Sequence, residues 1–169
     1  MTLTLLEQAL VEEATKKSGL IWVEGSAPAR GLWHAWVDGA AHLLGDGPGE
    51  QPFPGLADGG TAEVTVRSKD KGGRLVAWSA AVRELPPGGE EWQAAVAELK
   101  GKRLNAPDSD AMTERWAREC RLVRLTPVAV HAELPGSSLA AHPLPTSATT
   151  RRPVPAALPK LLLKRKKRR

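Results

Sequence analysis

The feature that most constrains the fold is a pair of alternating apolar and polar segments joined by a glycine-containing turn. In residues 62–67 (AEVTVR), Val64 and Val66 are separated by polar residues, and residues 74–85 (RLVAWSAAVREL) alternate in a similar way. Alternation with a period of two is typical of a strand with one buried face. The KDKGG sequence at 69–73 supplies the glycines of a tight turn. The chain is therefore expected to contain a long antiparallel hairpin.

A second hairpin is expected to turn at Asp38-Gly39, because both central residues of such a turn need a positive φ angle. Residues 45–60 are dense in glycine and proline and predict a long irregular loop. Further strands are expected from β-branched and aromatic residues. They fall within residues 19–25 (GLIWVEG), 31–39 (GLWHAWVDG), 40–46 (AAHLLGD) and 120–130 (CRLVRLTPVAV).

Two segments have the periodicity of amphipathic helices, Thr4–Lys17 and Glu90–Lys100. A short helix is also expected at 113–119 (TERWARE). The acidic start and basic end of the second helix both suit the helix dipole. The apolar stripes consist of Leu6, Leu10 and Ala14 in the first helix and of Trp92, Val96 and Leu99 in the second.

Strands joined by hairpins imply antiparallel pairing, and about six of them with flanking helices predict a small, mainly β barrel. The order of the elements over residues 2–130 resembles the split β-barrel family of pyridoxamine-phosphate-oxidase-like proteins. The resemblance rests on the helix at the start, the paired strands, the 62–85 hairpin, the EEWQAAVAELK helix and the final CRLVRLTPV strand. It implies a six-stranded antiparallel split β-barrel.

The same resemblance implies a cofactor of the flavin or deazaflavin type, such as FMN, and an oxidoreductase-like function with its substrate left open. It also implies a homodimer, since family relatives often pair with cofactor clefts at their interface. The candidate cofactor-binding residues are His34, Trp36, Arg67, Ser68 and Lys69. Backbone amides in a glycine-rich turn and basic side chains are the groups that hold a phosphate.

Other interpretations of these residues stay open. The basic cluster of the hairpin (Arg67, Lys69, Lys71 and Arg74) is better explained as a solvated tip, because charged residues are usual there, except for Arg67, which lies on the strand. His34 and His42 could approach each other across the Asp38-Gly39 hairpin, but two histidines without a third ligand do not make a zinc site, and no metal is expected. Trp33 and Trp36 are three residues apart on one expected strand and should face opposite sides.

The loop after the third expected strand favours a different function. Residues 45–56 (GDGPGEQPFPGL) contain no basic side chain and carry Asp46 and Glu50. A phosphate dianion there would meet negative charge. This favours the alternative that the protein is a non-catalytic binding module with no cofactor.

The basic residues are concentrated at the end of the chain. The net charge is +5, yet residues 135–169 hold nine basic and no acidic side chains, so the first 134 residues have a net charge of −4. We therefore expect a split-barrel domain at 1–133 and a Pro/Ala/Ser-rich tail at 134–169, which should be disordered because it lacks apolar periodicity. The tail ends in six consecutive basic residues: Lys164, Arg165, Lys166, Lys167, Arg168 and Arg169.

Such a block attracts nucleic acid or another polyanion without reading its sequence. The competing interpretation is a solubilising tail.

The single cysteine, Cys120, cannot form an intramolecular disulfide, and neither a secretory signal nor an apolar run of membrane-spanning length is recognisable. These features predict a cytoplasmic protein with no membrane span, and a buried structural thiol at Cys120.

Overall fold

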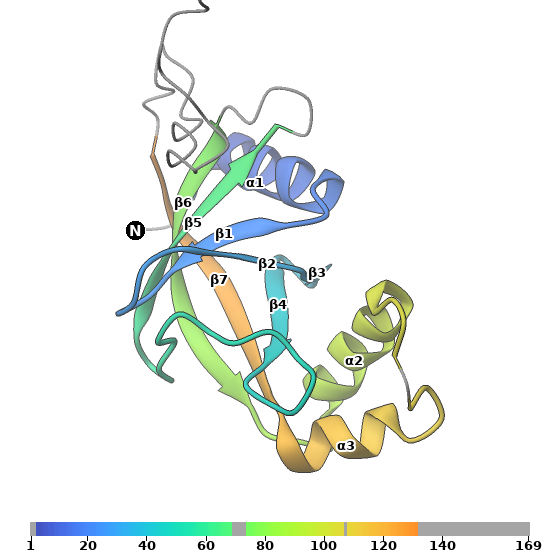
Figure 1. Ribbon diagram of the computed structural model, residues 1–169. Coiled ribbons are helices and arrows are strands. Elements are labelled where there is room, and N and C mark those ends of the chain that lie inside the picture. The colour runs from blue at the N-terminus through green and yellow to red at the C-terminus, as the bar shows by residue number, and fades with distance from the viewer. Residues whose placement is uncertain (1–2, 69–73, 107, 132–169) are drawn as a thin grey trace, which may run out of the picture.

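The structure is a computed structural model that describes residues 3–68, 74–106 and 108–131. Within them the chain forms one seven-stranded antiparallel sheet with three helices at its periphery (Figure 1). The elements are α1 (Leu5–Lys17), β1 (Ile21–Glu24), β2 (Arg30–Leu32), β3 (Ala35–Val37), β4 (Ala40–Gly45), β5 (Thr61–Arg67), β6 (Arg74–Leu85), α2 (Glu90–Lys102), α3 (Met112–Glu119) and β7 (Arg121–His131).

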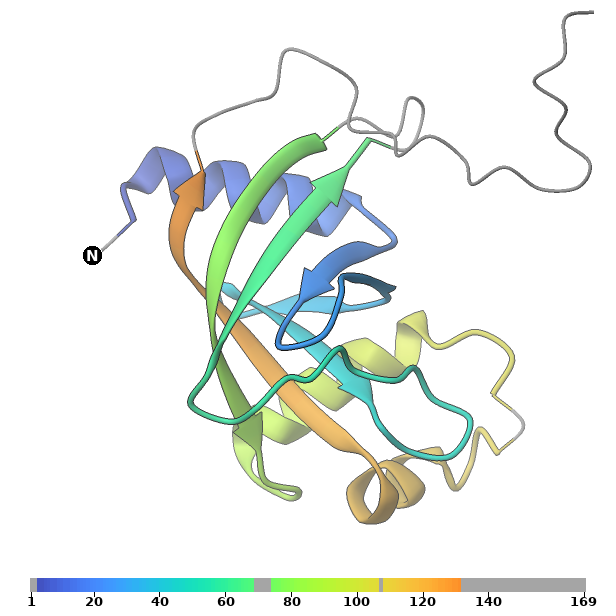
Figure 2. The ribbon, with the colours of Figure 1, turned by 60° about the vertical axis from the view of Figure 1, so that its left-hand side comes forward.

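The strand order shows that the sheet curls almost into a barrel. The order is β2-β1-β5-β6-β7-β4-β3, so the two edge strands, β2 and β3, are neighbours in the sequence. Only two residues separate Leu32 from Ala35, and a connection of that length spans at most about 10 Å. The two edges must therefore lie close together, which requires a strongly curved sheet. Figure 2 shows this curvature in β5, β6 and β7. The expected mainly β, antiparallel fold with flanking helices is confirmed.

The sheet has seven strands instead of six because the segment at 31–39 is divided. Its first part pairs with β1 and its second part with β4. At the break, the Gln51 carboxamide takes the place of a neighbouring strand. It accepts a hydrogen bond from the Trp33 N–H at 2.9 Å and donates one to the Trp33 carbonyl at 2.9 Å. The turn after β3 is as expected, with φ of 46° at Asp38 and 72° at Gly39.

Two apolar clusters lie on opposite faces of the sheet. The first fills the inside of the curl and is closed by α1, and the second lies between the sheet and α2 and α3. Trp36 packs against the first cluster, where it meets Trp78 edge to face at 6.3 Å, whereas Trp33 packs against the second and contacts Trp116. The expectation that Trp33 and Trp36 face opposite sides is thus confirmed.

The first helix forms where expected but buries a different face. Thr4 caps α1, accepting a hydrogen bond from the Glu7 N–H while the Glu7 carboxylate accepts from the Thr4 backbone. The buried residues of α1 are Val11 and Thr15, whereas Leu6 is 81% exposed. The apolar spacing thus identified the helix, but the stripe containing Leu6 is not its packed face. In α2, by contrast, the predicted stripe of Trp92, Val96 and Leu99 is buried.

Some expectations fall outside the described residues. These are the tip of the long hairpin at 69–73, including the candidate Lys69, and the tail at 134–169, including the basic block at 164–169. Both stay predictions. Of the described helices, none is long and apolar enough to span a membrane.

Candidate functional site

Arg67 projects from the outer face of β5. The alternation of this strand turns Val64 and Val66 into the core and leaves Arg67 on the opposite side. The guanidinium carbon of Arg67 lies 4.5 Å from the centroid of the Trp22 ring on β1, where Trp22 is the cross-strand partner of Thr65. Such a cation–π contact contributes roughly 0.5–1 kcal/mol at an exposed site. It holds the guanidinium over the indole, in a defined place.

Beside this arginine is a small pocket between the end of α1 and the strands β5 and β6. Its volume is about 170 Å³, and two cations and two hydroxyl groups line it, with no carboxylate among the described residues that line it. Lys17 comes from the last turn of α1, and Arg67 and Ser68 from the end of β5. The pocket has the chemistry of a receptor for a small anion. It is lined by Ala14, Lys17, Ser18, Arg67, Ser68 and Leu75.

Arg67 differs from most of the other arginines that the structure describes, which are Arg30, Arg74 and six that form ion pairs. Those six pair with acidic side chains, whereas no carboxylate among residues 3–68, 74–106 and 108–131 pairs with Arg67. Its Nε is also buried without a hydrogen-bond partner among the described atoms. A buried donor without an acceptor costs about 1–3 kcal/mol, so this guanidinium has hydrogen-bonding capacity that the described residues do not use. The paired arginines are Arg83, Arg103, Arg115, Arg118, Arg121 and Arg124.

His34, another candidate, lies beneath α1 and is only 1% exposed. Its Nε2 is 2.9 Å from the Thr15 carbonyl, an acceptor, so Nε2 carries the proton and donates. Burial is the main cause that lowers the pKa of His34 to about 4. The imidazole is therefore neutral at pH 7 and acts as a structural link between β3 and α1.

His42 is equally buried, but it does not approach His34 across the hairpin as the sequence suggested it could. The register places His42 opposite Ala35, not opposite His34, and Ala35 belongs to the cluster under α2. Burial, followed by the nearby positive charge of Arg124, lowers the pKa of His42 to about 4. The two histidines thus do not form a pair, because the two-residue turn at Asp38-Gly39 pairs Val37 with Ala40 and so places His42 one position out of step with His34.

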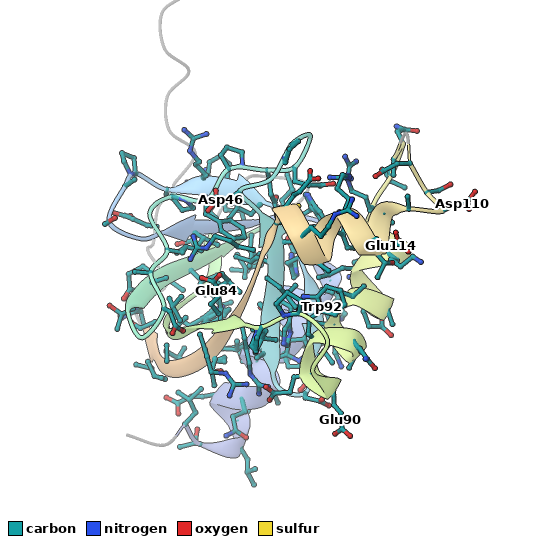
Figure 3. All side chains as sticks on the ribbon, turned by 90° about the horizontal axis from the view of Figure 1, so that it is seen from below. Asp46, Glu84, Glu90, Trp92, Asp110 and Glu114 are labelled. Atoms are coloured by element: carbon teal, nitrogen blue, oxygen red, sulfur yellow. The ribbon has the colours of Figure 1, made fainter. Side chains whose placement is uncertain are left out.

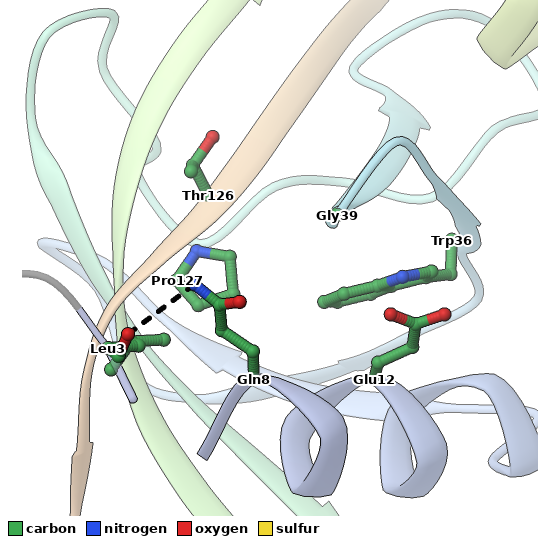
Figure 4. A pocket seen from close by; sticks show the side chains of 7 residues that line it. All are labelled: Leu3, Gln8, Glu12, Trp36, Gly39, Thr126 and Pro127. Carbon is green, nitrogen blue, oxygen red and sulfur yellow. Dashed lines mark hydrogen bonds between the residues drawn. The ribbon is translucent and has the colours of Figure 1, made fainter. Parts of the chain in front are cut away.

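Trp36 lines a second pocket rather than the one at Arg67. This pocket lies between α1, the β3–β4 turn and β7 (Figure 4). Of the five candidate residues, the structure brings together only Arg67 and Ser68. Trp36 and His34 lie elsewhere, and Lys69 is outside the described residues.

The acidic loop at 45–56 is neutralised within the fold. The Glu50 side chain is fully buried and accepts hydrogen bonds from Arg103 Nε, Arg115 Nη2 and Trp116 Nε1, each at 3.0 Å. Arg115 also binds Asp108, and these two carboxylates, Asp108 first, raise the pKa of the guanidinium. The expectation that Glu50 would repel a phosphate is therefore wrong, because this carboxylate is enclosed by arginines from α2 and α3.

The second carboxylate of the loop, Asp46, is neutralised in the same way. Arg121, the first residue of β7, pairs with Asp46 at 2.9 Å and with Glu84 at 2.7 Å. Figure 3, which views the molecule of Figure 1 from below, labels Asp46 and Glu84. The loop is thereby fastened to the ends of β6 and β7.

A serine, a histidine and a glutamate meet on the exposed face of β5, β6 and β7. The Ser79 hydroxyl donates to Glu63 at 2.6 Å, and His131 Nε2 lies 3.1 Å from Ser79 Oγ and 2.8 Å from Glu63. A nucleophilic serine needs its proton accepted by one imidazole nitrogen while the acid holds the other. Here both groups contact the same nitrogen, so the cluster is not a catalytic triad.

Cys120 is partly buried at the end of α3, and burial is the main cause that raises the pKa of its thiol. The thiol is thus less buried than expected, but a thiol held in its protonated form is a weak nucleophile. The part of the chain that the structure describes also contains no group of three or more His, Cys, Asp or Glu side chains placed to hold a metal ion.

Lys17, Ser18 and Trp22 lie at or beside the Arg67 pocket but were not predicted as site residues from the sequence. Lys17 and Ser18 end a helix that is 50 residues away from Arg67 along the chain, and no local pattern indicates that the two segments meet. The position of Trp22 could have been found from the alternation of β1, which places it on the outer face. Its contact with Arg67 depends on the pairing of β1 with β5.

Comparisons with known proteins give a structural likeness only. No protein-family model matches the chain, and no curated protein matches it in sequence. A crystal structure of HutZ, the heme storage protein from Vibrio cholerae, is 10% identical, with a TM-score of 0.48 over 78% of this chain and 94% of that one. A putative general stress protein 26 from Jannaschia sp. CCS1 is 13% identical, with a TM-score of 0.45 over 70% of this chain and 71% of the other. Neither likeness assigns a ligand to this chain.

Proposed function

We propose that the protein is a cofactor-binding split-barrel protein, oxidoreductase-like, that takes a phosphate-bearing flavin or deazaflavin such as FMN. The observation that carries the proposal is the pocket at Arg67. Among the described residues it combines two cations and two hydroxyl groups with no carboxylate, and its arginine has a buried donor with no acceptor among the described atoms.

The residues of this pocket fit the phosphate group of such a cofactor. Arg67 presents several N–H donors in a planar arrangement, which suits phosphate oxygens, and Lys17 adds a second positive charge. Lys17 also pairs with Glu13, but both side chains are more than 60% exposed, so that contact is weak. The backbone and hydroxyl of Ser68 at the end of β5 complete the proposed phosphate site.

The pocket fits only this end of the cofactor. Sites that enclose a whole ligand of this size measure about 300–1,000 Å³, more than the 170 Å³ found here. The tricyclic ring therefore needs a further surface. The homodimer that the family resemblance implies would provide it, and the homodimer is part of this proposal.

A bound flavin or deazaflavin supplies hydride transfer. The contribution of this chain is to hold the phosphate through Arg67 and to keep the guanidinium in place on Trp22. His34 and Trp36, the other candidates, do not line this pocket.

The proposal is tested by titrating the full chain with FMN and with the deazaflavin coenzyme, following cofactor fluorescence and heat. Arg67→Ala should weaken binding by about ten- to a hundredfold, the loss expected for a charge-assisted bond to phosphate. Arg83→Ala, which removes an arginine that already has a carboxylate partner, is the matched control and should change binding little. Riboflavin lacks the phosphate, so its affinity for Arg67→Ala should equal its affinity for the original chain. Absence of binding to either coenzyme would refute the proposal.

A second candidate function follows from the charge of residues 135–169, which carry nine basic and no acidic side chains. The protein would then be a binding module that associates with nucleic acid through 164–169. If four to six phosphates are neutralised, log affinity should fall with log salt at a slope of roughly −3 to −5. A gel-shift series with the full chain and with a chain ending at 133 tests it, because equal binding by both would exclude the tail.

A further inference from the structure

A pocket separate from the one at Arg67 lies against the side of α1. Trp36 forms one wall and Thr126 and Pro127 of β7 form the other, while Gln8 and Glu12 of α1 form the floor (Figure 4). Its volume is about 220 Å³, and Leu3 and Gly39 complete the lining. The lining residues are distinct from those of the phosphate site proposed above.

Donors and acceptors both occur among the polar groups of this pocket, including the buried Trp36 indole N–H, but Glu12 is the one charged residue of the seven described residues that line it. The Glu12 carboxylate lies beside the indole ring of Trp36, and the Gln8 carboxamide turns its oxygen toward the middle of the pocket (Figure 4). The nitrogen of that carboxamide is 3.5 Å from the Leu3 carbonyl, to which it donates. None of the seven lining residues is a lysine, arginine or histidine.

We propose that this pocket binds a small organic cation, a primary ammonium group on a short apolar stem. The ammonium would donate to the Glu12 carboxylate and the Gln8 oxygen. The faces of aromatic rings attract cations, most strongly that of tryptophan, and the stem would lie between Trp36 and Pro127. This assignment does not depend on the proposed cofactor, because it uses none of the same residues.

A contact within α1 already shows that Glu12 accepts an ammonium group. Lys16 Nζ lies 2.5 Å from Glu12 Oε1, and the two side chains are 52% and 44% exposed. An exposed pair four residues apart on a helix contributes only about 0.3–0.5 kcal/mol, so an incoming ammonium can replace it. Lys16 is thus an internal competitor, and its removal should strengthen ligand binding.

The test uses the full chain with 2-phenylethylamine as the cation and 2-phenylethanol as a neutral control of similar shape, by calorimetry and ligand-observed NMR. The amine should bind with a dissociation constant on the order of 1 mM and the alcohol at least about tenfold more weakly. Glu12→Gln should weaken amine binding about two- to fivefold, and Lys16→Met should strengthen it about twofold. Glu13→Gln is the matched control, because its carboxylate pairs with Lys17 and does not line the pocket.

Several outcomes would overturn the assignment. Equal binding of the amine and the alcohol would remove the role of charge. Equal losses in Glu12→Gln and Glu13→Gln would indicate a diffuse attraction to the acidic helix face instead of a site. Gln8→Leu supplies a second test of the pocket, with an expected loss of about threefold for one neutral hydrogen bond. Because all four substituted residues (Gln8, Glu12, Glu13 and Lys16) are on the surface of α1, circular dichroism and thermal unfolding should confirm that each variant folds.

Discussion

Arginines at two ends of the molecule have opposite surroundings. At the α2–α3 end, Arg103 and Arg115 enclose the buried Glu50 carboxylate. At the α1 end, Arg67 lies on Trp22, and no acidic side chain in the described part of the chain pairs with it. Whether an arginine can bind a ligand anion therefore depends on whether a carboxylate lies next to it in the fold. The carboxylates of the acidic loop are paired with arginines, and Arg67, which lines a pocket and has no carboxylate partner among the described residues, is the candidate for binding.

The largest effect is expected from breaking the Glu50 contacts. Glu50→Gln should reduce the free energy of unfolding by about 3 kcal/mol, because it leaves two largely buried arginines without their shared carboxylate. The value is at the lower end of the usual range because Arg115 keeps Asp108 and Arg103 keeps backbone acceptors. Urea unfolding at neutral pH measures it.

Glu114→Gln is the control for this experiment. Glu114 is an exposed acidic residue on α3, and its substitution should change stability by less than about 0.5 kcal/mol. If Glu50→Gln were as mild as this control, the Glu50 contacts would not stabilise the fold in the way we describe.

The next effect concerns pH and the two buried histidines. Burial lowers the pKa of both His34 and His42 to about 4, from an ordinary value of 6.5. Between these values the unfolded chain binds more protons than the folded one, so stability falls as pH falls from 6.5 toward 4. Each histidine should cost about 2 kcal/mol at pH 4.5. His42→Leu should therefore lose less stability between pH 7 and pH 4.5 than the original chain, as urea unfolding at both pH values would show.

Imidazole NMR titration gives an independent measurement of the same effect. The ring signals of His34 and His42 should titrate well below pH 6. Ordinary values near 6.5 for both would contradict the burial that the structure gives these side chains.

The strands and turns were predictable because their signals are local. Alternation identified the buried positions of β5, and the positive φ angles at Asp38 and Gly39 follow from residues that tolerate them. The break in the segment 31–39 was not predictable, since it depends on Gln51, 18 residues from Trp33 in the chain. The packed face of α1 was misassigned for a related reason. Its spacing shows that a helix forms, whereas the neighbouring strands decide which side is covered.

The candidate site was predictable only in part. Arg67 and Ser68 were found because they end a strand beside a basic turn, and they do share a pocket. Lys17 was not found, because its approach to Arg67 results from the packing of α1 on the curled sheet. The function of Glu50 was misjudged because its arginine partners are 53 and 65 residues away.

A smaller effect on stability is expected from a substitution of Arg67, which tests directly whether this arginine differs in function from the arginines around Glu50. Arg67→Ala should change the free energy of unfolding by no more than about 1 kcal/mol, the worth of an exposed cation–π contact. It should nevertheless weaken coenzyme binding as described above. Glu50→Gln should show the reverse. Its free energy of unfolding should be lower, but at temperatures where it is still folded its affinity for the coenzyme should change little. A large loss of stability in Arg67→Ala would instead make this arginine part of the structural framework.

The smallest effect is expected from Glu13, the acidic partner of Lys17 next to the Arg67 pocket. Both side chains are well exposed, so Glu13→Gln should change stability by less than about 0.5 kcal/mol. The substitution removes the carboxylate that competes for Lys17, and affinity for inorganic phosphate or FMN should rise about twofold, more at low than at high salt because exposed charges are screened. Glu12→Gln, one residue away and paired with Lys16, should leave anion binding almost unchanged. An equal gain in both variants would mean that the net charge of α1, and not the release of Lys17, sets the affinity of this pocket.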